Sequence, residues 1–467
     1  MNKTVRVERG SRVIDEVLIT ASPYGLQAAA VAGGRPVAFF VEWSANPSRI
    51  GDLHVARPLG RMKGIDACIV DIGEGEEAFL QGARALEADG APPIVQVVCD
   101  AYEGKRARVT RRPVLAGRFA TFHPGGRGLA FSRRLRDPEA RRALTAVLDG
   151  LDTSGGALTI RAAAAACPDD AAAAAAALAA RWREVEAEAR RNRTPRRLWR
   201  AGGLLGRLLR DVVAPGTATI AIDDRAVLDR ATASAANEAP DLVPALSFEN
   251  ATPPTDPLFE RHDCAGRLAA ALEPEVVLRG GARLTIEETR ALCAIDVDTS
   301  QAASAAAAET AEAAGREIVL RNLAGLIAID FAGRRSKRRR ETQLAALERA
   351  LDADRTPHRV LGVTAGGVVE VNRKRLGPSL LQAFTEPTGN AFGGRRLRLE
   401  AAAHDAADAA RREATSGARA LTLRAAPALL ATLATPGATV LERWLGVPLT
   451  LIADPALPHG RFAVERS

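Results

Sequence analysis

The stretch Leu292–Arg340, LCAIDVDTSQ…REIVLRNLAGLIAIDFAGRRSKRRR, organises the interpretation of this chain. It contains two short apolar runs, CAI and LIAI, and each ends at an acid. The first run leads into Asp296, with Asp298 two residues further on, and the second leads into Asp330. Apolar runs of this length, bounded by turn residues, are typical of buried strands. Each run therefore predicts a strand that ends at a carboxylate.

An alanine-rich segment, residues 302–322, separates the two runs and predicts a helix. Strand–helix–strand places the two strands near each other in one sheet, so Asp296 and Asp330 are predicted to converge. Adjacent carboxylates repel unless a cation or a proton lies between them, and magnesium commonly uses one or two carboxylates together with substrate phosphate. A hydrolytic phosphodiester site fits this pattern. The alternative is that the acids cap the next helix or lie in solvent.

Cations follow the second acid. They are Arg334, Arg335, Lys337, Arg338, Arg339 and Arg340. Such a run attracts polyphosphate, and the net charge of +8 favours polyanionic ligands in general. Charge alone does not distinguish RNA from other polyanions.

Composition bounds the class of protein. With 467 residues, 47% hydrophobic and 26% charged, the chain is long enough for several compact domains. Its cysteines are widely spread and form no CxxC pair, which predicts core thiols in a reducing compartment rather than a disulfide framework or a zinc knuckle. The polar N-terminus and the absence of a long apolar run predict a soluble cytoplasmic protein without membrane contact.

The words AIDVDTS and AGLIAIDF resemble those of the ribonuclease E/G family, whose catalytic domain carries an (I/V)D(I/V)NS motif and later a GG(L/I)I(V/I)IDF motif. The resemblance implies a magnesium-dependent endoribonuclease of RNA processing or decay that prefers single-stranded RNA. Asp296 and Asp330 would bind the metal as catalytic residues. The family's asparagine falls on Asp298, a third candidate catalytic residue, which offers no amide donor and adds a negative charge.

The resemblance extends from about Val17 to the end and implies a multidomain α/β fold. Its parts are an N-terminal tail (1–16), an RNase H-like subdomain (17–49 and 216–273), an inserted OB-fold β-barrel (50–112), a 5′-sensor-like subdomain (113–215), a DNase I-like catalytic domain (274–395) and a small C-terminal α/β domain (396–467). The residues themselves predict a hairpin around Gly33-Gly34, a second hairpin around Gly280-Gly281, and a small closed barrel in the closely spaced short strands of residues 50–112.

Further residues are assigned to RNA binding by the resemblance. The family's two stacking aromatics fall on Ile69 and Phe79; an isoleucine has no π-face for stacking, and Phe79 could equally be a core residue. The other candidates for RNA contact are Lys105, Arg133, Arg134, Arg161, Arg373, Lys374 and Arg375. Arg161 belongs to the 5′-phosphate sensor, where the family's threonine partner is replaced by Ala162.

Departures from the family pattern leave alternatives open. The family's CPxCxG zinc-link word is EPTGNAFGGRR here, residues 386–396, so no zinc is expected. The partners implied are single-stranded RNA and a second copy of the chain, bound through the DNase I-like domain. The segment Thr299–Gly315 lacks a family loop word, which predicts slow turnover. The rivals are an RNA-binding relative with weak or lost catalysis, and a scaffold of RNA assemblies.

Overall fold

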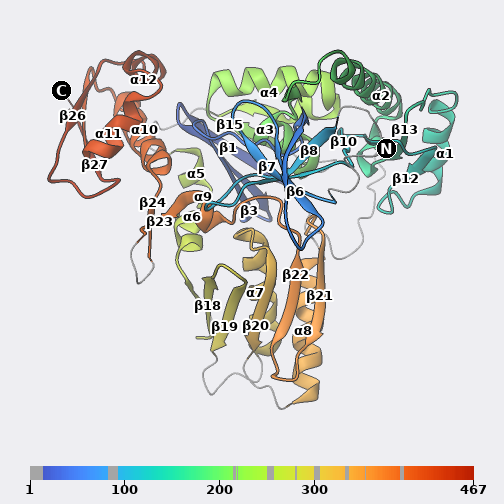
Figure 1. Cartoon of the computed structure of the whole chain (residues 1–467). Helices are drawn as coiled ribbons and strands as arrows, with labels where there is room; N and C mark the ends of the chain where they lie inside the picture. Colours follow the sequence, from blue (N-terminus) through green and yellow to red (C-terminus); the bar gives the residue numbers. More distant parts are fainter. Residues whose placement is uncertain are drawn as a thin grey trace, which may run out of the picture. The chain divides into compact units, whose positions relative to one another are not determined.

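The structure is a computed structural model of the chain. It describes residues 14–82, 93–213, 217, 219–249, 257–278, 281–298, 306–331, 336–352, 354–389 and 394–466. The chain divides into two compact units, unit 1 from Met1–Val41 and Asn250–Ser467 and unit 2 from Glu42–Glu249 (Figure 1). Each unit contains both strands and helices, so the predicted α/β class is confirmed. The finer domain boundaries stay predictions.

The sheet that carries the acids lies in unit 1, with strand order β17-β18-β19-β20-β22-β21. Its strands are β17 (Glu275–Val277), β18 (Arg283–Glu288), β19 (Cys293–Asp298), β20 (Gly325–Phe331), β22 (Val369–Arg373) and β21 (His358–Val363). β19 and β20 run parallel, and α7 (Ala306–Leu320) connects them. The predicted strand–helix–strand unit is therefore confirmed. β17 and β18 form the predicted second hairpin, although residues 279–280 of its turn lie outside the described residues.

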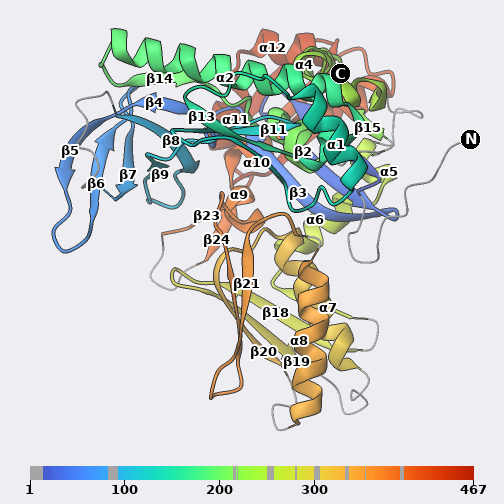
Figure 2. The same cartoon turned by 90° about the vertical axis from the view of Figure 1, so that its right-hand side faces the viewer.

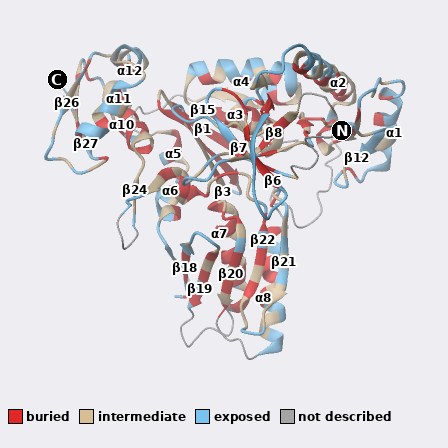
Figure 3. Ribbon diagram, viewed as in Figure 1, coloured by how far each residue is buried: buried red, intermediate tan, exposed pale blue. Residues whose placement is uncertain are grey.

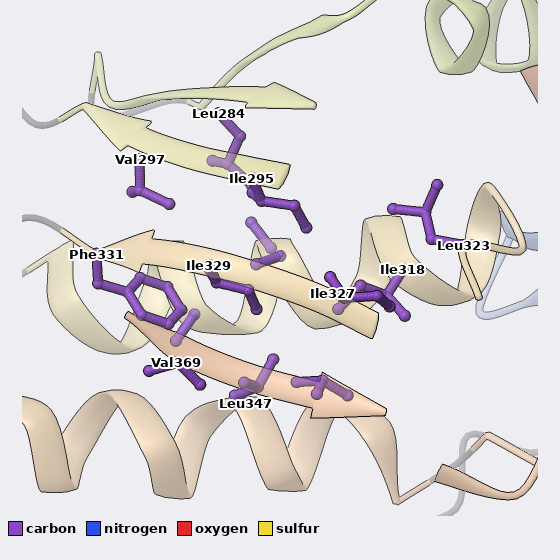
Figure 4. Close-up of a cluster of buried hydrophobic side chains, with 14 of the residues drawn as sticks. Leu284, Ile295, Val297, Ile318, Leu323, Ile327, Ile329, Phe331, Leu347 and Val369 are labelled. Atoms are coloured by element: carbon purple, nitrogen blue, oxygen red, sulfur yellow. The ribbon is translucent and has the colours of Figure 1, made fainter. Parts of the chain in front are cut away.

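Two helices cover one face of this sheet, α7 and α8 (Lys337–Leu351) (Figure 2). The residues between sheet and helices form one apolar core, which includes Ile295, Ile329 and Leu347 (Figure 4). The helices pack closely because Gly315 has no side chain: a Cβ there would lie 2.6 Å from the Cβ of Ala350. Alternate residues of β19 and β20 face away from this core, as the striped burial in Figure 3 shows.

Unit 1 also contains an N-terminal meander and a small C-terminal layer. The meander consists of β1 (Glu16–Ser22), β2 (Gly25–Ala32) and β3 (Arg35–Trp43). Gly33 and Gly34 form the two-residue turn between β2 and β3 with φ of 58° and 70°, which glycine adopts without strain, so the predicted hairpin is confirmed. The segment before Gly33 is itself a hairpin, formed by β1 and β2.

The C-terminal layer contains a three-stranded sheet with order β26-β25-β27 and three helices. These elements are β25 (Leu421–Ala425), β26 (Leu449–Ala453), β27 (Phe462–Arg466), α10 (Leu399–Thr415), α11 (Pro427–Ala434) and α12 (Ala438–Leu445). The core of this layer includes Tyr24 from the β1–β2 turn, whose hydroxyl donates to the Leu433 carbonyl at 2.7 Å. The remaining short elements of unit 1 are α5 (Leu258–Arg261), α6 (Cys264–Leu272), α9 (Leu380–Phe384), β23 (Thr385–Pro387) and β24 (Arg395–Leu397).

Unit 2 contains a seven-stranded sheet with order β14-β4-β8-β9-β7-β6-β5. Its strands are β4 (Leu53–Val55), β5 (Arg57–Arg61), β6 (Ala67–Asp71), β7 (Glu77–Gln81), β8 (Ile94–Cys99), β9 (Ala107–Thr110) and β14 (Arg196–Trp199). The predicted closed barrel is wrong for these described strands, because β14 and β5 are left as the two edges. The single residue Ala56 separates β4 from β5, so a kinked segment of chain pairs with β8 through one half and with β6 through the other.

The rest of unit 2 is a four-stranded sheet with its helices, and a short parallel pair. The sheet has order β10-β11-β13-β12, from β10 (Leu115–Ala116), β11 (Ala120–Pro124), β12 (Leu129–Phe131) and β13 (Gly156–Ile160). It shares a core with α1 (Pro138–Val147) and α2 (Pro168–Arg191), the alanine-rich helix that begins at Pro168. After α3 (Gly203–Arg207) and a π-helical turn (Leu208–Val212), β15 (Thr219–Ile222) pairs with β16 (Leu246–Phe248), and α4 (Arg225–Glu238) connects them.

Candidate active site

The two aspartates at the strand ends lie opposite each other in the sheet. The register of the parallel pair β19–β20 sets Asp296 against Asp330. Neighbouring strands are about 4.8 Å apart, and residues paired in a parallel register share a face. Ile295, Val297 and the residues paired with them point into the core, so the aspartates point to the opposite face. The predicted convergence of the two carboxylates is therefore present in the backbone.

Other polar groups lie on the same face. Asp298 is two residues further along β19, and both it and Asp296 are exposed. Thr285 on β18 pairs with Asp296, which brings a hydroxyl-bearing residue beside the carboxylate. On β22, Glu370 alternates with the core residues Val369 and Val371, and so it lies on this face too. Glu370 and Thr285 are residues that the sequence did not single out, because β22 and β18 carry no distinctive motif there.

The donor set suits a hard cation. Two carboxylates from adjacent strands offer oxygen ligands and leave the remaining positions of an octahedral ion for water and phosphate, as magnesium prefers. Among the residues that the structure describes, no group of three or more His, Cys, Asp and Glu side chains is arranged to hold a metal. Within the described ranges, the candidate ligands are the pair Asp296 and Asp330.

The cationic run after β20 is partly described. Arg334 and Arg335 lie outside the described residues, whereas Lys337–Arg340 form the first turn of α8, capped by Ser336, whose hydroxyl accepts from the Arg339 amide. Cations in a first helical turn are disfavoured by the helix dipole, by roughly 0.3–1 kcal/mol each at exposed positions. An anion bound nearby would offset that cost.

Of the segment Thr299–Gly315, residues 299–305 are outside the described residues and the others belong to α7.

The basic segment Arg373–Arg375 contains both buried and exposed side chains. Arg373 is 3% exposed, and its guanidinium donates to both Asp354 carboxylate oxygens, at 2.7 and 3.2 Å, and to Asn322, Leu323 and Thr356. This position argues for a structural role, because the donors that would contact phosphate are already used.

The neighbours of Arg373 differ from it. Arg375 donates to the Ala324 carbonyl at 2.6 Å and to Gln382 at 3.2 Å, which ties the start of β20 to α9. Lys374 is the exposed member of the three. Only Lys374 therefore presents its side chain to solvent in the way that phosphate contact requires.

In unit 2, register places Phe79 on the outer face of the seven-stranded sheet. Phe79 is half-buried and alternates with the core residues Ala78 and Leu80. It pairs with Ile69 on β6 and with Arg108 on β9. The sequence left open whether Phe79 is a core residue, and the alternation assigns it to the outer face.

Lys105 lies on a tight turn beside an aromatic residue. The backbones of Tyr102 and Lys105 bond to each other at 2.8 and 3.1 Å, and Glu103 and Gly104 both have positive φ. The Lys105 ammonium lies 5.2 Å from the centre of the Tyr102 ring. Sequence reasoning missed Tyr102, although the spacing Tyr-Glu-Gly-Lys is a signal for a turn that brings its first and last residues together.

The predicted 5′-end residues are also in unit 2. Arg133 and Arg134 are exposed in the loop after β12. Arg161 is more enclosed: it donates to the Gly117 carbonyl at 2.6 Å and pairs with the Asp211 carboxylate at 3.0 Å. Burial lowers the pKa of Arg161, and Asp211 opposes that shift. Arg161 and Asp211 are far apart in the sequence, and no sequence signal links them.

The remaining sequence expectations concern thiols, zinc and membranes. Cys68, Cys99, Cys264 and Cys293 are buried and Cys167 is half-buried, all as free thiols, so four are the small core residues predicted. The segment in place of the zinc-link word contributes to the β23–β24 hairpin, with residues 390–393 outside the described part. Over the described ranges, no helix has both the length and the apolarity needed to cross a bilayer.

The fold and the site define an α/β protein with a paired-carboxylate centre on a sheet whose other face is packed by helices. Residues 114–376, more than half of the chain, match the model of the Ribonuclease E/G family. The chain belongs to the ribonuclease E/G family, and the predicted resemblance is confirmed.

Individual relatives agree with the family match. Ribonuclease G of Escherichia coli is 28% identical over 397 residues, which are 78% of this chain and 81% of that protein. Ribonuclease E of Nostoc sp. is 29% identical over 444 residues, 90% of this chain and 60% of that protein. Ribonuclease G of Haemophilus influenzae is 26% identical over 415 residues, 82% of this chain and 84% of that protein.

Proposed function

We propose that this chain is a magnesium-dependent endoribonuclease that cuts single-stranded RNA. Its family membership and its relatives named Ribonuclease G and Ribonuclease E indicate an endoribonuclease, a hydrolase that acts on RNA. The observation that supports the metal dependence is the pairing of Asp296 with Asp330 on the face of the sheet opposite the α7–α8 core. Asp296 is exposed and Asp330 is half-buried, and a cation held between two neighbouring carboxylates offsets their mutual repulsion.

Asp296 and Asp330 would hold the metal, and the neighbouring residues would orient the substrate. A bound magnesium ion would supply a Lewis acid for a phosphoryl oxygen and lower the pKa of a water molecule. The oxygen of water bonds to phosphorus as the P–O3′ bond breaks, which leaves a 5′-phosphate and a 3′-hydroxyl. Thr285 beside Asp296 can hydrogen-bond a water or a phosphate oxygen. Lys337–Arg340 form the first turn of α8, the next helix in the chain after β20.

We propose that the outer face of the seven-stranded sheet binds the RNA strand. Phe79 provides a ring for a base, a contact that is worth about 1–3 kcal/mol when a base stacks. Arg108 lies next to Phe79 in register, and Lys105 with Tyr102 forms a neighbouring turn. Arg133 and Arg134 are exposed cations suited to phosphate. The kinked β4–β5 segment supports assigning this sheet to a partly open OB-fold rather than to a closed barrel.

The RNase H-like, 5′-sensor-like and DNase I-like assignments are proposals of the same kind, as is a homodimer through the DNase I-like part. A cytoplasmic location also stays a prediction. A second candidate function is RNA binding with weak or lost catalysis. It is favoured by Asp298 in place of the family's asparagine and by the engagement of Arg161 with Asp211.

The direct test is cleavage of a fluorogenic single-stranded RNA by the purified full chain with magnesium, with EDTA, and with a duplex of the same sequence. The proposal expects cleavage of the single strand only with magnesium, and products with a 5′-phosphate. Binding without cleavage at any magnesium concentration would favour the second candidate. Equal cleavage in EDTA would overturn the metal assignment.

A further inference from the structure

Two glycine-rich turns of unit 2 line a hollow that the proposed function does not use. One turn is residues 125–128, GGRG, between β11 and β12, and the other is residues 153–156, TSGG, where the chain enters β13. Together they line a cavity of about 350 Å³. Pockets for small molecules usually measure about 300–1,000 Å³, so the space suits a compact ligand. We call this cavity the two-turn pocket.

Backbone hydrogen bonds hold the walls of the two-turn pocket together. The Gly125 amide donates to the Gly155 carbonyl at 2.8 Å, and the Leu158 amide donates to the Gly128 carbonyl at 2.9 Å. Gly125, Gly128 and Gly155 have φ of 75°, 82° and 87°, which glycine adopts without strain. The pocket therefore takes its shape from the backbone rather than from long side chains.

Hydrogen-bond donors predominate around the pocket. The amides of Arg127, Gly128 and Gly155 donate to no other group within the described ranges. Thr153 adds a hydroxyl-bearing residue to the lining. Backbone amides presented by turns of this kind form concavities that bind anions. The two-turn pocket therefore favours an anionic ligand.

Arg127 supplies a positive charge. It is exposed, and its guanidinium forms no hydrogen bond or ion pair with the part of the chain that the structure describes. The lining residues include no Asp or Glu. Asp152, next to the second turn, accepts from the Ser154 amide at 2.8 Å and pairs with Arg183 at 3.5 Å, so its charge is partly offset. A guanidinium beside free amides is a donor set suited to the oxygens of a phosphoryl group.

The two-turn pocket is separate from Arg161, the residue that the family resemblance assigns to the 5′ end. The pocket includes Gly156, the first residue of β13, whereas Arg161 follows the last residue of that strand. At about 3.3–3.4 Å per residue, the strand places the two positions about 17 Å apart. One phosphate cannot contact both.

We infer that the two-turn pocket binds a small phosphate ester through its phosphoryl group, with Arg127 and the turn amides donating to the phosphoryl oxygens. The described lining contains no aromatic ring on which a base could stack, which favours a free ester over an RNA strand. The volume limits the ligand to a compact molecule. This inference goes beyond the proposed function and does not depend on it.

The experiment is isothermal titration calorimetry of the purified full chain in EDTA with ribose 5-phosphate, with inorganic phosphate and with unphosphorylated ribose. One variant carries Arg127→Gln, which removes the charge, and another carries Ser154→Asp, which places a carboxylate in the pocket wall. The matched control is Arg230→Gln, at an exposed position on α4 that, like Arg127, has no ion pair with a described residue. Thermal unfolding identifies the variants that are folded.

We expect wild type to bind ribose 5-phosphate and inorganic phosphate saturably, and not to bind ribose. Each pocket variant should bind the ester at least about tenfold more weakly, equivalent to about 1.4 kcal/mol, while the control binds as wild type does. Wild type without saturable binding of either phosphate probe would overturn the inference. Pocket variants within twofold of wild type would overturn it too, and so would an equal loss in the control, because binding would then reflect another site or general charge.

A further arm separates RNA from a free ester. It measures the affinity of a single-stranded RNA without a terminal phosphate. If Arg127→Gln weakens RNA binding and wild type does not bind ribose 5-phosphate, the pocket contacts RNA and the inference is overturned. Magnesium-dependent RNA cleavage is measured on the same samples. Ester binding without cleavage would count against the proposed function alone, and cleavage without ester binding would count against this inference alone.

Discussion

Replacing Arg373 by methionine removes a buried charge and leaves its partners in place. Arg373 and Asp354 have side chains only 3% and 4% exposed, and five hydrogen bonds of the guanidinium would be lost. Deleting one partner of a buried ion pair costs about 3–5 kcal/mol, because the other charge stays buried and unpaired. The total stability of a domain is about 5–15 kcal/mol. Arg373→Met should therefore lose a large part of the free energy of unfolding of unit 1.

The assay is urea unfolding followed by circular dichroism, with Lys374→Met as the matched control. A loss of 4 kcal/mol with a slope of about 2 kcal/mol per molar urea lowers the midpoint by about 2 M. Lys374 is exposed, so its variant should unfold as wild type does. Adding Asp354→Asn to Arg373→Met should restore part of the loss, since the buried charge is then gone. An Arg373→Met protein with unchanged stability and greatly weakened RNA binding would refute the structural role.

Three further predictions concern the 5′ end, pH and the carboxylate centre. Rates on 5′-monophosphate and 5′-hydroxyl RNA should differ by about a hundredfold at most, because Arg161 is held by Asp211 and one charge-assisted contact of about 1.5–3 kcal/mol is the most that remains. Asp211→Asn should increase the preference, and a preference well above a hundredfold in wild type would contradict this reasoning. Burial lowers the pKa of His54, which is 1% exposed, so the native state favours the neutral imidazole. The stability that depends on this neutral imidazole is fully present above the ordinary histidine pKa of about 6.5, and it is lost as the pH falls from there through the native pKa. In urea titrations the stability of wild type should fall more steeply below about pH 6.5 than that of His54→Gln, and parallel curves would exclude the histidine. Asp298→Asn removes a negative charge and supplies an amide beside Asp296, so single-turnover cleavage should become several-fold faster; a slower variant would show that Asp298 is itself required.

The sequence predicted the centre of unit 1 well because its signals are local. Two apolar runs with a helix between them define β19, α7 and β20, and the parallel register then follows from the topology. The same locality explains the success at the Gly33-Gly34 turn, where a two-residue loop needs positive φ at both positions. These features depend on residues that are neighbours in the chain, so they can be predicted from the sequence.

Features that depend on distant partners could not be predicted. Arg373 resembles a phosphate-binding residue in the sequence, but its role depends on Asp354 and on a fold that buries both. Arg161 is likewise defined by Asp211, which no spacing rule connects to it. The closed barrel was an error of the same kind, since strand spacing gives the number of strands but not the pairing of the first with the last.

The most direct test of the central claim is the effect of Asp330→Asn on cleavage and on binding of the same single-stranded RNA. Asp229→Asn, an exposed acid on α4, serves as the control for charge. The paired-carboxylate account predicts that Asp330→Asn abolishes magnesium-dependent single-turnover cleavage while RNA affinity stays equal or increases, because a metal ligand and a charge that repels phosphate are both removed. Cleavage by Asp330→Asn at the wild-type rate would contradict the account.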